Sequence, residues 1–183
     1  RDRLYISTKG FNIMSFKKIE LSELSFNPFK LIGSDWMLIT GGDISNYNTM
    51  TASWGQFGKL WNKDVFTCYI RPNRYTYGFV EDNDCFTASF FNEKYREALK
   101  FCGANSGRNC DKAKETGLTP KDFDGCTAFE EAEMVFVCKK LYNDELKADS
   151  FLTSDGFAEK FYGSDPYHKE YIAEVTAVYI KEK

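Results

Sequence analysis

The chain has 183 residues, a formal net charge of −3 at pH 7 and a sequence pI of about 5.4. Acidic and basic residues are interspersed, so we expect neither nucleic acid nor an anionic membrane as a partner. No apolar run approaches the roughly 20 residues of a spanning helix, and the N-terminus lacks the apolar region of a secretory signal.

We expect residues 1–13 to be an N-terminal extension, either ahead of the true start or poorly ordered, and residues 14–183 to form one domain. Residues 17–26 are either a short helix or an extended edge, which Pro28 ends. The predicted strands are 36–40, 49–57, 64–71, 85–91, 127–131, 133–142 and 171–180. The predicted helices are 74–81, 92–102, 111–115 and 155–162. A hairpin loop at 41–46 joins the first two strands, and Asn92 and Gly103 cap the second helix.

The order of these elements indicates the fold class. Strands dominate, and the strict alternation of strand and helix that builds a parallel sheet is missing. Aromatic residues make up 17% of the chain, and they favour strands. We therefore predict a mainly β fold, an antiparallel β-barrel with helical insertions, whose closure removes exposed strand edges.

The six cysteines stand at positions 68, 85, 102, 110, 126 and 138. None forms a Cys-x-x-Cys pair, and His168 is the sole histidine, so the sequence predicts no metal site. The even number permits three disulfides. A chain of this length does not need such crosslinks, and we expect reduced thiols in a cytoplasmic protein.

The stretch Tyr47-Asn48-Thr49-Met50-Thr51-Ala52-Ser53-Trp54-Gly55 is the most informative part of the sequence. Its short side chains would let a flat aromatic ligand approach the backbone, whose N–H and C=O groups could bind the ligand's polar edge. The Trp54 ring could cover the ligand's face. The same pattern also fits an ordinary amphipathic strand, with the hydroxyl side chains outward and Met50, Ala52 and Trp54 inward.

Two further segments carry cations beside short polar residues. Arg71-Pro72-Asn73-Arg74-Tyr75-Thr76-Tyr77 lies at a strand-to-helix junction, where a helix N-terminus and cations would favour an anion such as phosphate. Ser106-Gly107-Arg108-Asn109-Cys110-Asp111-Lys112 offers more cations in a loop. Both segments are also compatible with solvated side chains, and known phosphate-loop and nucleophile motifs do not occur.

Several motifs together match a known family. They are Trp36-Met37-Leu38-Ile39-Thr40, Asn48 to Gly55, Arg71-Pro72-x-Arg74-Tyr75-Thr76-Tyr77, Phe86-Thr87-x-Ser89-Phe90, Cys102-Gly103-x-x-Ser106-Gly107-Arg108-x-x-Asp111-Lys112, Gly117-Leu118-Thr119-Pro120 and His168-x-x-Tyr171-Ile172-x-Glu174-Val175. In this order they resemble the flavin reductase-like proteins with the FMN-binding split-barrel fold, within them the flavoredoxin-type branch. The resemblance covers nearly the whole chain.

The resemblance implies FMN as the cofactor. The residues implied to bind it are Asn48, Thr49, Met50, Thr51, Ala52, Ser53, Trp54, Arg71, Arg74, Thr76, Lys112 and His168. The first seven would line the flavin rings, and Thr76, Lys112 and Arg71 or Arg74 would hold the phosphate. His168 would lie near the cofactor, although a lone histidine is more often structural. No protein side chain is assigned a catalytic role, because the chemistry occurs on the flavin.

Two departures from the family pattern are visible. Ala173 stands where the last motif usually has glycine, which would slightly alter close backbone approach there. The segment between Tyr142 and Tyr167 is longer than in the shortest relatives and would form a lid or a dimer contact.

The resemblance further implies an oxidoreductase that takes electrons from NAD(P)H and passes them, through FMN, to a free flavin, a metal complex or a protein acceptor. It also implies a homodimer. A non-catalytic protein that binds FMN for storage or sensing is the alternative. A barrel that binds no flavin is the third reading.

Overall fold

The computed structural model describes residues 15–153 and 155–182, so the predicted extension at residues 1–13 lies outside the described residues. The strands are β1 (Phe16–Ile19), β2 (Met37–Asp43), β3 (Asn46–Ala52), β4 (Gly55–Leu60), β5 (Lys63–Ile70), β6 (Cys85–Phe90), β7 (Pro120–Phe123), β8 (Cys126–Phe129), β9 (Met134–Glu145) and β10 (Lys169–Lys181). The α-helices are α1 (Pro28–Lys30), α2 (Tyr75–Asp82), α3 (Arg96–Ala104), α4 (Lys112–Thr116) and α5 (Phe157–Phe161). Short 3₁₀ turns occupy Leu21–Glu23, Glu93–Tyr95 and Ala148–Ser150, and a π-helical turn occupies Leu31–Asp35.

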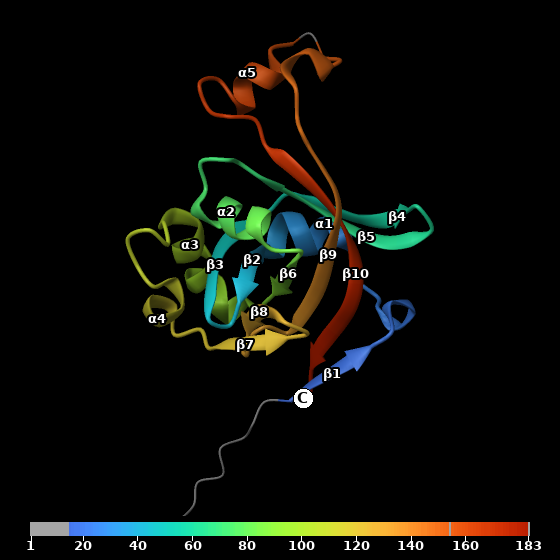
Figure 1. Ribbon diagram of the computed structural model, residues 1–183, viewed down its shortest axis with the longest axis vertical. Coiled ribbons are helices and arrows are strands. Elements are labelled where there is room, and N and C mark those ends of the chain that lie inside the picture. The colour runs from blue at the N-terminus through green and yellow to red at the C-terminus, as the bar shows by residue number, and fades with distance from the viewer. Residues whose placement is uncertain (1–14, 154, 183) are drawn as a thin grey trace, which may run out of the picture.

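One antiparallel sheet forms the body of the protein (Figure 1). Its strands follow the order β3-β2-β6-β9-β10-β5-β4, and β1 pairs with β10. The two ends of this path, β3 and β4, are consecutive in the sequence and are joined only by Ser53 and Trp54. Within the described residues no pairing joins β3 to β4. The predicted antiparallel barrel is confirmed. Because β3 and β4 do not pair, the barrel is split along this seam and β3 is an edge strand.

Successive side chains of a strand point to opposite faces of the sheet. Here each face packs into its own hydrophobic core. Met37 and Ile39 point into the barrel, where they pack with Phe66 and Phe136. Leu38, between them, points to the outer face, where α3, α4 and the β7–β8 hairpin cover it. Burial on both faces explains why β2 reads as a continuous apolar run.

Three local expectations were wrong. Pro28 opens a helix, with the Asn27 side chain accepting hydrogen bonds from the next turn, because proline suits a first helical position. The predicted strand at 49–57 is two strands, since the chain bends at the seam. Gly103 lies inside α3, where a Cβ would contact Thr51 at 3.3 Å, so it serves close packing against β3. The remaining predicted strands and helices are present with shifted ends, and β7 was missed.

The expectation of reduced thiols was wrong for one pair. Cys85, at the start of β6, is bonded to Cys126, at the start of β8, with a Cα–Cα distance of 6.5 Å. The two residues are 41 positions apart, and only the packing of the β7–β8 hairpin onto β6 brings them together. Cys68, Cys102, Cys110 and Cys138 are free thiols.

The last two strands carry the longest excursion of the chain. β9 and β10 pair as far as Glu145 and Lys169, and the residues between them project beyond the barrel with α5 (Figure 1). Ala173, the departure from the expected glycine, is fully buried in the barrel core beside an irregularity in the β9–β10 register.

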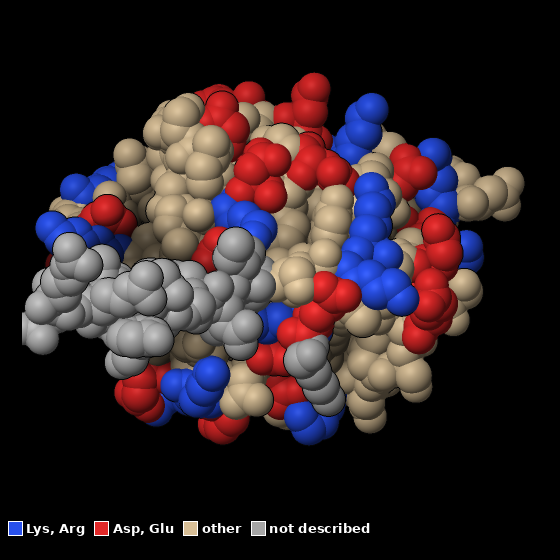
Figure 2. Space-filling view, turned by 90° about the horizontal axis from the view of Figure 1, so that it is seen from below, with Lys and Arg blue, Asp and Glu red and all other residues tan. Residues whose placement is uncertain are grey.

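The outer surface carries both signs of charge. Seen from below, acidic and basic side chains are interspersed (Figure 2). Among the helices of residues 15–153 and 155–182, none has the length and apolar character needed to cross a bilayer.

Candidate functional site

The edge strand β3 forms one wall of a groove. An edge strand pairs on one side only, so it leaves main-chain N–H and C=O groups free for other partners. Met50 and Ala52 pack against the barrel core, whereas Thr51 lies on the opposite face and its hydroxyl donates to the carbonyl of Leu99 in α3. Trp54 is 44% exposed. The amphipathic reading of this strand thus holds for Met50 and Ala52 but was wrong for Trp54, which faces the groove.

A buried polar network anchors one end of the groove. The Asn48 amide donates to the Thr76 hydroxyl at 2.7 Å, and both residues are buried. The Lys112 ammonium donates to the carbonyls of Thr49 at 2.8 Å and Cys102 at 2.7 Å, which ties β3 to α3 and α4. Burial lowers the pKa of Lys112. An ammonium has three N–H donors, so one donor of Lys112 is left beyond these two bonds.

Arg74 and Arg108 lie at the same end of the groove. We call it the cationic end, and we define it by Asn48, Arg74, Thr76, Arg108 and Lys112. These five residues line one hollow of about 180 Å³. The exposed Arg74 side chain has no hydrogen bond or ion pair to any residue that the structure describes. The Arg108 guanidinium lies over the Tyr75 ring at 4.8 Å. The excess positive charge here suits an anion.

Arg71 lies with a different part of the chain. Its guanidinium forms an ion pair with Asp165 and donates to the carbonyl of Phe161 at 2.7 Å. It also lies over the Tyr162 ring at 5.4 Å. Arg71 therefore holds the α5 excursion against the groove, while Arg74, three residues later, is left free for a ligand.

His168 lies where the excursion returns to β10. Its ring is 5.1 Å from that of Trp54, centroid to centroid, and its Nδ1 is 3.1 Å from the Tyr162 hydroxyl. Burial, and then the charges of Arg71 and Arg74, lower the pKa of His168 to about 4. The imidazole is consequently neutral at physiological pH, and Tyr162 orients it.

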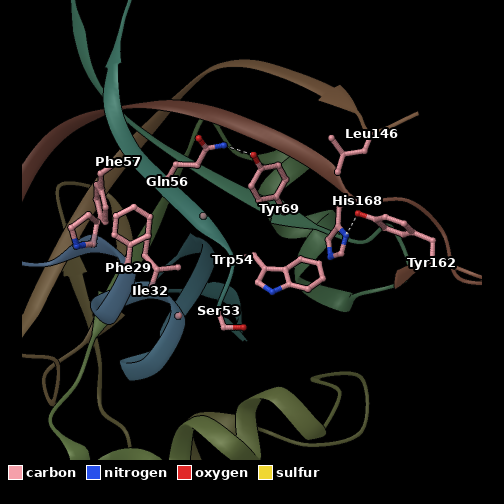
Figure 3. A pocket seen from close by; sticks show the side chains of 13 residues that line it. Phe29, Ile32, Ser53, Trp54, Gln56, Phe57, Tyr69, Leu146, Tyr162 and His168 are labelled. Carbon is pink, nitrogen blue, oxygen red and sulfur yellow. Dashed lines mark hydrogen bonds between the residues drawn. The ribbon is translucent and has the colours of Figure 1, made fainter. Parts of the chain in front are cut away.

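A hollow of about 700 Å³ opens beside the seam between β3 and β4 (Figure 3). Trp54, Gln56 and Tyr69 line it together with Phe29, Tyr162 and His168. We call it the seam cavity. The Gln56 side-chain amide donates to the Tyr69 hydroxyl. Among the described residues that line it, none is an Asp, Glu, Lys or Arg.

The hollows form one continuous groove. A hollow of about 250 Å³ shares Arg74 and Met50 with the cationic end, and Trp54 and His168 with the seam cavity. The predicted residues that line the cationic end and this middle hollow are Asn48, Met50, Thr51, Ala52, Ser53, Trp54, Arg71, Arg74, Thr76, Lys112 and His168. Thr49 turns away and bonds Thr40, so it contributes only its carbonyl to the network.

Sequence reasoning missed several residues of the groove, among them Arg108, Gln56 and Tyr69. Arg108 belongs to the segment 106–112, in which Lys112 was assigned to the phosphate but Arg108 was not. Gln56 and Tyr69 carry no local signal, because they meet only through the pairing of β4 with β5. In the described part of the chain, no group of three or more His, Cys, Asp or Glu side chains is placed to hold a metal ion.

Comparison with protein families gives one match: residues 29–183 match the flavin reductase like domain. Comparison with curated proteins gives no match.

Solved structures share the fold. The FMN-binding domain of a flavin reductases-like enzyme from Shewanella baltica OS155 is 14% identical, with a TM-score of 0.63, over 91% of this chain and 78% of that chain. The flavoredoxin of Desulfovibrio vulgaris (Miyazaki F) is 20% identical, with a TM-score of 0.63, over 91% and 78%. The flavoredoxin from Methanosarcina acetivorans is 17% identical, with a TM-score of 0.62, over 91% and 76%.

Proposed function

Since this chain belongs to the flavin reductase like domain family, we propose that its groove binds FMN and that the protein is an NAD(P)H-dependent oxidoreductase. Structures of similar fold described as FMN-binding and as flavoredoxin support the cofactor. Bound FMN would supply two-electron chemistry, taking electrons from NADH or NADPH and passing them to an acceptor.

The residues of the groove fit FMN in three respects. The cationic end offers Arg74 and Arg108 to a phosphate, with a remaining N–H donor on Lys112. The free edge of β3 offers main-chain donors and acceptors to the polar edge of a flat ring system. Trp54 offers an aromatic face next to that edge. The single observation that carries the proposal is the meeting of unpaired cations and an unpaired strand edge in one groove.

The protein's own part in the reaction would be to bind, orient and exclude water. The buried Asn48–Thr76 and Lys112 bonds keep the edge strand in place, so the groove is preorganised. His168 would be neutral at pH 7, and its orientation by Tyr162 would keep one ring nitrogen available for a hydrogen bond in the groove. No protein nucleophile is required.

Reconstitution tests this function. The protein is titrated with FMN while flavin fluorescence is followed, and the loaded protein is then assayed for oxidation of NADH and NADPH with free flavin, a ferric complex or a redox protein as acceptor. We expect saturable FMN binding and nucleotide-dependent turnover. Binding without turnover would favour a storage or sensing protein. An absence of binding would refute the cofactor and leave only a barrel that binds no flavin.

Two further parts of the proposal concern assembly and location. Exposed apolar side chains, among them Phe29 at 86% and Leu152 at 99% exposure, support a homodimer in which the segment between Tyr142 and Tyr167 serves as contact or lid. Light scattering tests this assembly.

A cytoplasmic location is tested by alkylating thiols in intact cells. Disulfides are rare in the cytosol, so an intact Cys85–Cys126 bond would count against that location.

A further inference from the structure

The two ends of the groove differ in charge. Arg74, Arg108 and Lys112 line the cationic end, whereas the seam cavity has no acidic or basic side chain among its described lining residues. His168, the one titratable imidazole there, is neutral above about pH 4. Arg71 and Arg74 line the middle hollow next to the seam cavity and not the seam cavity itself. A charged ligand held in the seam cavity would therefore lose hydration without an ion pair to any of its described lining residues, which is unfavourable.

The seam cavity nevertheless offers one polar contact point. The Gln56 amide donates to the Tyr69 hydroxyl, and neither group has another side-chain hydrogen bond within the described residues. The hydroxyl proton of Tyr69 and the side-chain carbonyl of Gln56 therefore remain for a ligand. In Figure 3 both side chains lie on the same wall of the cavity, across from Phe29 and Ile32.

The other walls are flat and apolar. Trp54, Phe29, Phe57 and Tyr162 contribute aromatic surface. The volume of about 700 Å³ is within the range of roughly 300–1,000 Å³ typical of small-molecule sites. Aromatic walls with a few placed polar groups favour planar ligands, which stack on the rings and direct a polar substituent to the donors.

We propose that the seam cavity binds an uncharged, planar aromatic compound bearing a carbonyl or hydroxyl group, such as a quinone, and that compounds of this class accept electrons from the protein. The acceptor assignment rests on the proposed function; the binding site does not. For a quinone, a hydride from NAD(P)H and one proton from solvent give NAD(P)⁺ and the hydroquinone. Charged metal complexes would then be poor acceptors.

Equilibrium dialysis with two matched probes tests the site. The probes are 2-naphthamide, which is neutral, and 2-naphthoate, which has the same rings and a negative charge at pH 7.5. Both are measured with the full-length protein, before and after loading with FMN. We expect 2-naphthamide to bind at least about tenfold more tightly than 2-naphthoate, because the carboxylate has no partner.

A charge placed in the cavity should reverse this preference. Gln56 is exposed on β4, so Gln56→Lys should fold normally and should favour 2-naphthoate. Leu60→Lys adds the same charge to the same strand but outside the cavity lining, and it should leave the preference for 2-naphthamide unchanged. Thermal unfolding of each variant checks that the fold is intact.

The outcomes separate the two proposals. Equal affinity for both probes, no saturable binding of 2-naphthamide, or the same preference in Gln56→Lys as in the wild type would overturn the neutral site. If FMN binds and 2-naphthamide does not, only the further inference fails. If 2-naphthamide binds with the expected preference and FMN does not, the site stands and the flavin function fails.

Discussion

The two ends of the groove are stabilised by different kinds of interaction. At the cationic end, buried polar groups from four separate segments satisfy one another: Asn48 with Thr76, and Lys112 with two carbonyls. At the seam cavity, aromatic rings provide most of the contacts, as Trp54 does with His168 and Phe161. A buried hydrogen-bond network tolerates little change, because every unpaired member is costly, whereas aromatic packing is more forgiving. We therefore expect substitutions in the buried hydrogen-bond network of the cationic end to affect folding more than substitutions in the seam cavity.

Reduction of the Cys85–Cys126 disulfide should have the largest effect. The bond closes a loop of 41 residues, and the chain-entropy relation gives a loss of about 4 kcal/mol in the free energy of unfolding. Cys126 shares a hydrophobic cluster with Cys102 and Ala113, beneath the cationic end. Urea unfolding with and without reductant measures the loss, and hydrogen exchange should rise in α4 more than around His168.

The double variant Cys85→Ser, Cys126→Ser is the control, and reductant should leave its stability unchanged. Equal stability of the oxidised and reduced wild type would contradict this prediction.

Lys112→Met should lower the free energy of unfolding by about 2–4 kcal/mol, because two buried carbonyls lose their donor. The same variant should weaken FMN binding by about 1–3 kcal/mol, the value of a charge-assisted hydrogen bond. Urea unfolding and FMN titration measure the two effects. Lys114→Met, on the exposed side of the same helix, is the matched control. Equal behaviour of the two variants would show that the network does not anchor β3.

Acidification should act on the other end, through His168. Its folded-state pKa of about 4 is below the ordinary value of 6.5, so between these values the unfolded chain binds the extra proton. Stability is then fully present above pH 6.5 and falls as the pH decreases towards 4, by about 1–3 kcal/mol. The loss is measured by urea unfolding at pH 7.5 and pH 4.5.

His168→Gln should lose less over this range, since the chain has no other histidine. Burial raises the pKa of Glu170, so this residue makes the folded protein more stable as the pH falls, which is opposite to the effect of His168. This contribution is the same in the variant and the wild type. Parallel pH profiles of the variant and the wild type would refute the role of His168.

Arg74→Ala should have the smallest effect on folding, because the Arg74 side chain is exposed and bonds to no described residue. Its effect on FMN should be a loss of about 1–2 kcal/mol, which increases as salt is lowered. Lys100→Ala removes an exposed cation of α3 and is the control. Unchanged FMN affinity in Arg74→Ala would place the phosphate elsewhere.

Patterns among neighbouring residues were sufficient to predict much of the fold. The apolar run of β2, the alternation in β6, the N-cap at Asn92 and the short side chains of β3 are properties of neighbouring residues, and each predicted its element correctly. The boundary inside residues 49–57 was missed because only Ser53 and Trp54 lie between the two strands. Only their different partners, β2 and β5, separate them.

Sequence was sufficient to predict the strand-rich fold, the wall of the groove and the cations near it, because each is encoded in a few consecutive residues. Tertiary structure alone decided that Arg71 pairs with Asp165, that Cys85 meets Cys126 and that Gln56 and Tyr69 share a cavity without charge. Each of these depends on residues far apart in the sequence. Their proximity follows from how strands pair and pack, which no local pattern records.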